Sequence, residues 1–246
     1  MAPLVHAARA TGITTLTLDS PANRNALSAQ LVGELRAALA AAGEDADTRA
    51  VLLTHTGNTF CAGADLKSPC DPADFLALLR ELTTMPKPVV ARVTGHVRAG
   101  GLGLLGACDI AAAGPQSSYA FTETHLGLAP AVISMTLLPR LDPRAASRYF
   151  LTAEPFDAAE ATRIGLLTLH TDGDPDTALA PVLDGLRKAS PQALAETKAM
   201  VAAGVREALD RDGDRLTELS ARLFASAEAR EGITARFERR DPSWVR

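Results

Sequence analysis

Two glycine-rich segments of the chain could place backbone amides around a single oxygen atom. The first is FCAGADL at residues 60–66, and the second is GHVRAGGLG at residues 95–103. Each follows an apolar, strand-like run, and small residues let a ligand approach the backbone closely. If each segment directs one N–H at the same point, the pair forms an oxyanion hole, which stabilises charge developing on a carbonyl oxygen. Either segment alone also fits a packed turn, so both are needed for this interpretation.

The second segment continues into a pattern that is typical of dinucleotide-binding proteins, but its context does not support that function. Residues 101–106 read GLGLLG, which fits GxGxxG, and Glu123 stands near the position of a ribose-binding carboxylate. A Rossmann unit needs a full helix and a second strand between the two. Only a short helix fits between Leu102 and Ala107, because a strand-like run already begins at Cys108. We therefore expect no nicotinamide cofactor at this segment.

Strand-like and helix-like segments alternate through the first half of the chain, and they would carry both loops. Short β-branched or apolar runs predict strands at residues 12–19, 49–54, 88–97 and 109–113. Helices are predicted after Ser28 and after Asp71, because each can cap a helix that shows apolar residues at helical spacing. This alternation favours an α/β fold with a parallel sheet.

From about residue 190 the chain is predicted to be almost entirely helical. Asp157 makes a capping-box-like start for an earlier helix, and the Ser-Pro pair at Ser190 opens the next one. The helical pattern then continues to about residue 240. The change of pattern predicts a boundary between an α/β core at residues 1–189 and a helical oligomerisation region at residues 190–246.

The composition is that of an ordinary globular protein and excludes several classes of function. Hydrophobic residues make up 47%, charged residues 22%, and the net charge is −4. No overall positive field would therefore draw the chain to nucleic acid or to an anionic membrane. Cys61, Cys70 and Cys108 form neither a CxxC pair nor a zinc spacing, which indicates reduced thiols. With no apolar run near the roughly 20 residues of a membrane span, we expect a cytoplasmic protein.

Several segments, in order, resemble the crotonase (enoyl-CoA hydratase/isomerase) superfamily. The two glycine-rich segments match its two oxyanion loops, and FTETHLGLAP at residues 121–130 matches the segment that carries a catalytic glutamate. The number of matching segments, in the same order as in the family, makes the resemblance specific. The other matching segments are NALS at residues 25–28, DAAEATRIGLL at 157–167, the SPxAxxxxK pattern at 190–198, and REGI at 230–233 followed by Phe237 and Pro242.

The resemblance implies a fold, an assembly and a substrate. The fold would be a crotonase-like spiral of ββα units followed by a helical trimerisation region, in a homotrimer or a hexamer of two trimers. The substrate would be an acyl-CoA thioester, with no metal and no cofactor beyond the coenzyme A that the substrate carries. The backbone N–H groups of Ala64 and Gly100 would bind the thioester oxygen, and Glu123 would move a proton.

The same resemblance assigns residues to the coenzyme A part of the substrate. Phe237 would come from a neighbouring subunit. The residues expected to line the coenzyme A path within one chain are Ala22, Asn23, Arg24, Ala62, Asp65 and Leu66.

Hydratases of this family commonly use two glutamates, and this sequence departs from that pattern. The second glutamate belongs three residues after the second oxyanion glycine, where this chain has Gly103. We expect Glu123 to act alone, or with His125 as a substitute, in a pocket with extra room beside Gly103. Arg98 replaces a usually apolar residue and could meet an acidic acyl group or an ion-pair partner. For both His125 and Arg98, a surface or ion-pair role is the simpler interpretation.

We therefore predict an acyl-CoA lyase, an enoyl-CoA hydratase that adds water across the 2,3 double bond. GLAPAVIS at residues 127–134 resembles bacterial methylglutaconyl-CoA-type hydratases, which favours a branched acyl chain. Two alternatives stay open. An enoyl-CoA isomerase would use the single glutamate to move the double bond. A non-catalytic acyl-CoA-binding member would have no need of Glu123. The sequence does not distinguish a trimer from a hexamer.

Overall fold

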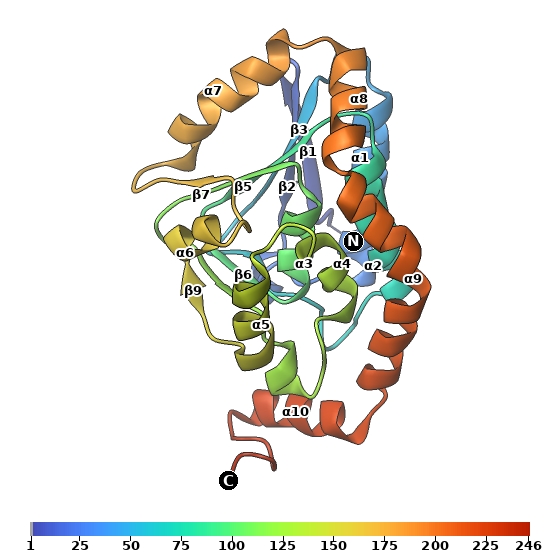
Figure 1. The fold of residues 1–246 in the computed structure, drawn as a ribbon, viewed down its shortest axis with the longest axis vertical. Helices are drawn as coiled ribbons and strands as arrows, with labels where there is room; N and C mark the ends of the chain where they lie inside the picture. Colours follow the sequence, from blue (N-terminus) through green and yellow to red (C-terminus); the bar gives the residue numbers. More distant parts are fainter. Residues whose placement is uncertain (1) are drawn as a thin grey trace.

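The computed structural model describes residues 2–246, and its centre is a six-stranded sheet with helices on both sides (Figure 1). The strand order is β1-β2-β3-β5-β7-β10. β1 pairs with β2 in antiparallel fashion, and the other neighbouring strands are parallel, which confirms the α/β class. The strand bounds are Val5–Ala10 (β1), Ile13–Leu18 (β2), Ala50–His55 (β3), Val89–Val93 (β5), Ile110–Ala113 (β7) and Leu169–His170 (β10).

A smaller, four-stranded sheet has the order β4-β6-β8-β9. The prediction of one strand over residues 88–97 was wrong, because β5 ends in the larger sheet and β6 begins in the smaller one. The chain changes sheets at Gly95, where a β-carbon would lie 2.2 Å from the carbonyl oxygen of Asn58. Glycine alone allows that approach. The strand bounds are Thr59–Cys61 (β4), His96–Arg98 (β6), Ser118–Ala120 (β8) and Phe156–Asp157 (β9).

Three helices of the first 190 residues begin where their capping residues predict. The side chains of Ser28, Asp71 and Asp157 accept hydrogen bonds from backbone N–H groups in the first turns of α1, α2 and α6. Two short 3₁₀ helices, η1 (Pro21–Asn23) and η2 (Glu123–Leu126), lie between the larger elements. The helix bounds are Ala29–Glu44 (α1), Pro72–Thr84 (α2), Gly100–Ala107 (α3), Ala131–Leu137 (α4), Pro143–Thr152 (α5), Ala158–Arg163 (α6) and Pro175–Lys188 (α7).

The larger sheet buries apolar side chains on both faces. Val90 and Ala112 pack with Leu179 of α7 on one face, whereas Val89 and Ala91 belong to the main core shared with α1 and α2 on the other. Alternate residues of a strand point to opposite faces, so β5 and β7 contribute to both clusters. The two glycine-rich loops leave β4 and β6 of the smaller sheet, whose Phe60, Cys61 and Val97 are buried in the main core.

Three helices, α8 (Pro191–Val201), α9 (Ala203–Phe224) and α10 (Ala227–Glu238), form the C-terminal region, which confirms the predicted helical pattern. α9 packs against α2 and α4 of the core, and α10 packs against η2 (Figure 1). The boundary at residue 190 thus marks a change of secondary structure, and its role as a domain boundary stays a prediction. Within residues 2–246, no helix combines the length and the apolar character needed to cross a membrane.

Candidate active site

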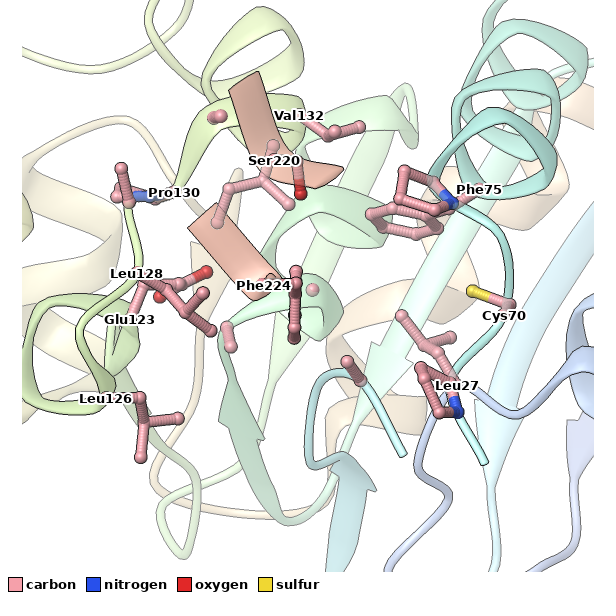
Figure 2. Close-up of a pocket in the computed structure, with 18 of the residues that line it drawn as sticks. Leu27, Cys70, Phe75, Glu123, Leu126, Leu128, Pro130, Val132, Ser220 and Phe224 are labelled. Atoms are coloured by element: carbon pink, nitrogen blue, oxygen red, sulfur yellow. The ribbon is translucent and has the colours of Figure 1, made fainter. Parts of the chain in front are cut away.

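A cavity of about 270 Å³ lies where α2, α4, η2 and the end of α9 approach the two glycine-rich loops. Figure 2 shows side chains from these elements around it, with Glu123 on one side and Phe75 on the other. Both loops reach the wall, through Ala62 and Ala64 of the first and Ala99 and Gly100 of the second. The apolar side chains around it are Leu27, Leu66, Phe75, Leu126, Leu128, Val132, Ile133 and Phe224.

The two glycine-rich loops touch each other at Gly63, as the oxyanion-hole prediction requires. Gly63 has φ +89°, a left-handed conformation that favours glycine. A β-carbon there would lie 2.7 Å from Cβ of Ala99 and 3.3 Å from the backbone nitrogen of Gly100. Only glycine therefore allows the loops to approach this closely, and the approach brings Ala64 and Gly100 to the same cavity.

The backbone N–H of Ala64 points away from the segment that pairs with its loop. The Leu27 N–H donates to the carbonyl of Gly63 at 2.8 Å, and the carbonyl of Leu27 accepts from Asp65 at 3.3 Å. The C=O and N–H of a trans peptide point in opposite directions. Since the Gly63 carbonyl faces Leu27, the N–H of the same peptide, which belongs to Ala64, faces the other way.

The N–H of Gly100 is free because Gly100 is the first residue of α3. The first N–H groups of a helix have no partner within the helix, and the helix dipole favours negative charge at that end. Across the described residues, neither the Ala64 N–H nor the Gly100 N–H donates a hydrogen bond to the protein. Two unpaired donors at one cavity wall provide the donor set of an oxyanion hole.

Glu123 contributes an acidic side chain to the cavity wall. It begins η2, is only 8% exposed, and points toward the centre of the cavity (Figure 2). Burial raises the pKa of its carboxyl to about 7, and Oε2 is buried without a hydrogen-bond partner in the protein. An unpaired carboxyl with a pKa near neutrality is suited to taking up and returning a proton.

The expected extra room beside Gly103 is absent. A β-carbon at Gly103 would lie 2.5 Å from Cγ2 of Ile133 and 3.4 Å from Cζ of Phe75. The Ile133 side chain therefore fills the space that a side chain at residue 103 would enter. Glu123 is the single carboxylate among the described residues that line the cavity.

Neither His125 nor Arg98 lines the cavity. His125 is exposed to solvent. Arg98 is half-buried on β6, where its guanidinium donates to the carbonyl oxygens of Val97 and Ser118 and to the hydroxyl of Ser118. No acidic partner of Arg98 occurs in the described part of the chain, so its observed role is to tie β6 to β8.

The residues expected along the coenzyme A path lie around the first loop. Ala62 and Leu66 line the cavity itself. The Ala62 N–H donates to the carbonyl of Arg24 at 3.1 Å, and the Asn23 side chain donates to Asp65 at 3.2 Å. These bonds hold η1 and the residue after it beside the loop.

Two further assignments lie outside the cavity. Ala22 is an exposed residue in the middle of η1. Phe237 lies on α10 and is 54% exposed. Its contact with a neighbouring subunit stays a prediction.

The end of α9 contributes side chains that the sequence interpretation did not assign to the site. Ser220, Ala221 and Phe224 line the cavity, and Phe224 lies in front of its centre (Figure 2). The only sequence signal was the apolar pattern of this helix, which predicts burial but not against which loop. Within residues 2–246, no group of three or more His, Cys, Asp or Glu side chains is arranged to hold a metal ion.

Comparison with known proteins places these features in a family. Residues 8–246 match the family model described as enoyl-CoA hydratase/isomerase. The solved structure of an enoyl-CoA hydratase from Mycobacterium avium is 50% identical, with a TM-score of 0.93 over 100% of both chains. An enoyl-CoA hydratase from Shewanella pealeana is 32% identical, with a TM-score of 0.77 over 98% of this chain and 96% of that one. A carnitinyl-CoA hydratase from M. avium is 26% identical, with a TM-score of 0.88 over 100% of this chain and 99% of that one.

Proposed function

Since this chain belongs to the enoyl-CoA hydratase/isomerase family, we propose that it is an enoyl-CoA hydratase that adds water across the 2,3 double bond of a coenzyme A thioester. One observation carries the proposal. Two unpaired backbone amides and one buried, unpaired carboxyl line the same small cavity. The first can hold the oxygen of a thioester, and the second can move the protons of the reaction.

The amides of Ala64 and Gly100 would stabilise the enolate. When an oxygen nucleophile adds to C3 of the enoyl group, electrons move to the thioester oxygen and leave negative charge there. Two fixed N–H donors in a water-poor cavity stabilise that charge, and removal of one such donor typically costs about 2.7–4 kcal/mol of transition-state stabilisation.

Glu123 can serve both proton transfers of the hydration. In its ionised form it takes a proton from water as the water oxygen bonds to C3. It then returns that proton to C2 as the enolate collapses to the hydroxyacyl thioester. One carboxyl is sufficient, because the proton that it takes from water is the same proton that it returns to C2. A pKa of about 7 keeps the ionised form populated at neutral pH.

The single carboxylate favours one second candidate, an enoyl-CoA isomerase. Such an enzyme takes a proton from C2 of a 3-enoyl thioester and returns it to C4, which also needs one base and the same oxyanion hole. The filled space beside Gly103 supports this alternative, since no second carboxylate lines the cavity in the described residues. A purely binding role is less well supported, because it would leave the buried Glu123 without a function.

We place the coenzyme A beside η1 and the first glycine-rich loop, along Asn23, Arg24 and Asp65. The contacts that hold η1 against this loop support that path. The protein would act as a homotrimer or a hexamer in the cytoplasm, with Phe237 of one chain reaching the coenzyme A of another. The exposure of Phe237 in the single chain is consistent with this assembly.

The test is a panel of straight, branched and acidic enoyl-CoA thioesters, followed both for loss of the enoyl absorbance and for double-bond migration. Glu123→Gln should lower kcat/KM by about 10²–10⁴-fold and leave the affinity for saturated acyl-CoA nearly unchanged. For the wild type, kcat/KM should rise with pH to about 7 and then level off, because the base must be ionised.

Glu44→Gln is the matched control, since Glu44 is an exposed residue at the end of α1. Hydration by the Glu123→Gln protein at a rate near that of the wild type would contradict the proposed role. Double-bond migration without water addition would establish the isomerase. Binding of the whole panel without any turnover would establish the non-catalytic alternative.

A further inference from the structure

No cationic side chain lines the cavity in the described part of the chain. Among the described residues that line it, none is Lys, Arg or His, and the single carboxylate, Glu123, is itself an acid. The wall near Glu123 is apolar and buried, since Leu128, Val132 and Ile133 are 9%, 6% and 3% exposed. Once the thioester oxygen occupies the N–H groups of Ala64 and Gly100, a second negative charge in this cavity would lose its water without gaining a partner.

The cationic side chains in and directly beside the two loops and Glu123 lie outside the cavity wall, and Lys67, which directly follows the first loop, is exposed. The Arg98 guanidinium is occupied by the carbonyl oxygens of Val97 and Ser118, and it does not reach the cavity wall. His125 is exposed and also lies outside the wall. An acidic acyl group would thus find none of these cations within the cavity.

The apolar wall beside the oxyanion hole is fixed in position. The Thr136 hydroxyl donates to the carbonyl of Gly103 at 3.0 Å and ties α4 to α3. A β-carbon at Gly106 would lie 2.8 Å from the carbonyl oxygen of Thr136, so the two helices are already in close contact. Ile133 lies one turn before Thr136 on α4, against Gly103, so close packing of the two helices holds its side chain in the wall.

We propose that this site selects acyl groups without charge and rejects acyl groups that end in a carboxylate. The inference rests on the proposed function, because it assumes that the acyl part of a coenzyme A thioester occupies the cavity. Burial of an unpaired carboxylate is costly, and the proximity of Glu123 adds like-charge repulsion. Branched and straight alkyl groups remain acceptable. A methylglutaconyl group, which carries a free carboxylate, is excluded.

The test compares two saturated thioesters of equal chain length, octanoyl-CoA and ω-carboxyheptanoyl-CoA, by titration calorimetry on the wild-type protein. Octanoyl-CoA should bind at least about fivefold more tightly, since burial of an unpaired polar group costs about 1 kcal/mol or more. Equal affinity, or tighter binding of the acid, would overturn the proposal.

Neither probe has a double bond, so the result does not depend on turnover. If octanoyl-CoA is preferred but no enoyl-CoA is hydrated or isomerised, the proposed function fails and the selectivity stands. If enoyl-CoA is hydrated but both probes bind equally, the function stands and the selectivity fails. Absence of binding by octanoyl-CoA would overturn both.

A variant that supplies the missing cation provides the second test. Ala221 lies at the exposed edge of the cavity on α9, so Ala221→Arg places a guanidinium there with little disturbance of the core. The ratio of the two dissociation constants should shift by about tenfold in favour of the acid, as expected for a charged hydrogen bond. Ala193→Arg, at an exposed position of α8 away from the cavity, adds the same charge and should leave the ratio unchanged. An equal shift in both variants, or none in Ala221→Arg, would count against the proposal.

Discussion

At the scale of single residues, the burial of Glu123 affects folding as well as the proposed catalysis. Its carboxyl has an ordinary pKa of 4.5, and burial raises it to about 7 in the fold. Between these values the unfolded chain has lost a proton that the native protein still holds. The free energy of unfolding therefore falls as the pH rises from about 4.5 to about 7, and the full loss persists above pH 7.

Replacement of this carboxyl by a neutral amide should therefore stabilise the protein at high pH. At pH 8, Glu123→Gln is expected to raise the free energy of unfolding by roughly 3 kcal/mol, the equivalent of the pKa shift. At pH 4 both proteins are neutral at this position, so the difference should nearly vanish. Urea denaturation of both proteins at the two pH values measures this difference in the free energy of unfolding. A difference that does not change with pH would show that Glu123 is not a buried, strained acid.

Gly103 and Ile133 should behave as a coupled pair. Gly103→Ala inserts a methyl group 2.5 Å from Cγ2 of Ile133 and should cost about 1–3 kcal/mol by overpacking. Ile133→Ala should cost about 2–5 kcal/mol through the cavity it leaves. In the double variant the new methyl group enters the vacated space, so the combined loss should be smaller than the sum of the single losses by about 0.5–3 kcal/mol. Denaturation of the four proteins gives this coupling directly, and additive losses would disprove the contact.

At the scale of elements, the turn before α3 holds strain that orients the oxyanion hole. Ala99 has φ 47° and ψ −120°, a conformation that a residue with a β-carbon rarely adopts. The turn brings the N–H of Gly100 to the cavity wall. The neighbouring elements hold it in place, because the Ala99 N–H donates to the carbonyl of Ala120 at 3.2 Å.

Ala99→Gly should relieve this strain and preserve the site. We expect the free energy of unfolding to rise by about 1 kcal/mol, since relief of strain exceeds the added flexibility of the unfolded chain. Activity should stay near the wild-type value. Ala99→Val, in contrast, should lower both stability and activity. Thermal unfolding and kcat/KM of both variants test this, and a less stable glycine variant would show that the turn is unstrained.

The buried ammonium group of Lys198 connects helix α8 to the core. The Lys198 ammonium lies 2.9 Å from the Asp109 carboxylate and donates to the carbonyl oxygens of Leu82 and Lys87. The two charged side chains are 2% and 10% exposed. Burial lowers the pKa of Lys198, and the neighbouring carboxylate opposes that change. These contacts link α8 to the residue before β7, to the last turn of α2 and to the segment after it.

Lys198→Met should destabilise the protein by about 3–5 kcal/mol, because it leaves the Asp109 carboxylate buried without its cation. Lys188→Met, at an exposed position near the end of α7, is the control and should change stability by less than about 0.5 kcal/mol. Adding Asp109→Asn to Lys198→Met should recover part of the loss. Urea denaturation of these proteins decides the matter, and a Lys198→Met protein as stable as its control would exclude an energetic role for the pair.

At the scale of the whole molecule, the single chain leaves several large apolar side chains in contact with water. Met200 and Val201, where α8 ends, are 70% and 69% exposed, and Phe237 and Trp244 near the C-terminus are 54% and 41% exposed. Apolar surface of this kind on a folded chain is typical of an interface. It supports the proposed assembly of identical chains.

Sedimentation or light scattering at micromolar concentration should therefore give a mass at least three times the 25.7 kDa of one chain. Replacing Met200 and Val201 together by serine should weaken the assembly without unfolding the chain, because both side chains are largely exposed in the single chain. Replacement of Thr152, an exposed polar residue at the end of α5, by serine is the control. A monomeric wild-type protein would refute the assembly.

The sequence by itself determined the features that depend on residues close together along the chain. Ser28 and Asp71 cap their helices by bonds to residues two or three positions ahead, so the local pattern was sufficient. Both small-residue loops follow strands, but these are the short strands β4 and β6 of the smaller sheet, and β4 was not predicted. Glu123 was found through the resemblance of its segment to the family, and the structure places it in the cavity with Ala64 and Gly100.

Only the tertiary structure determined which distant segments contact one another. The strand predicted over residues 88–97 divides at Gly95 because the carbonyl of Asn58, far back in the chain, leaves no room for a β-carbon. Ile133 fills the space beside Gly103, and Phe224 of α9 lies across a cavity whose acid is at residue 123. Periodicity predicts that a side chain is buried but not which neighbour buries it. Contacts between distant segments depend on close packing of the whole core, which local patterns do not encode.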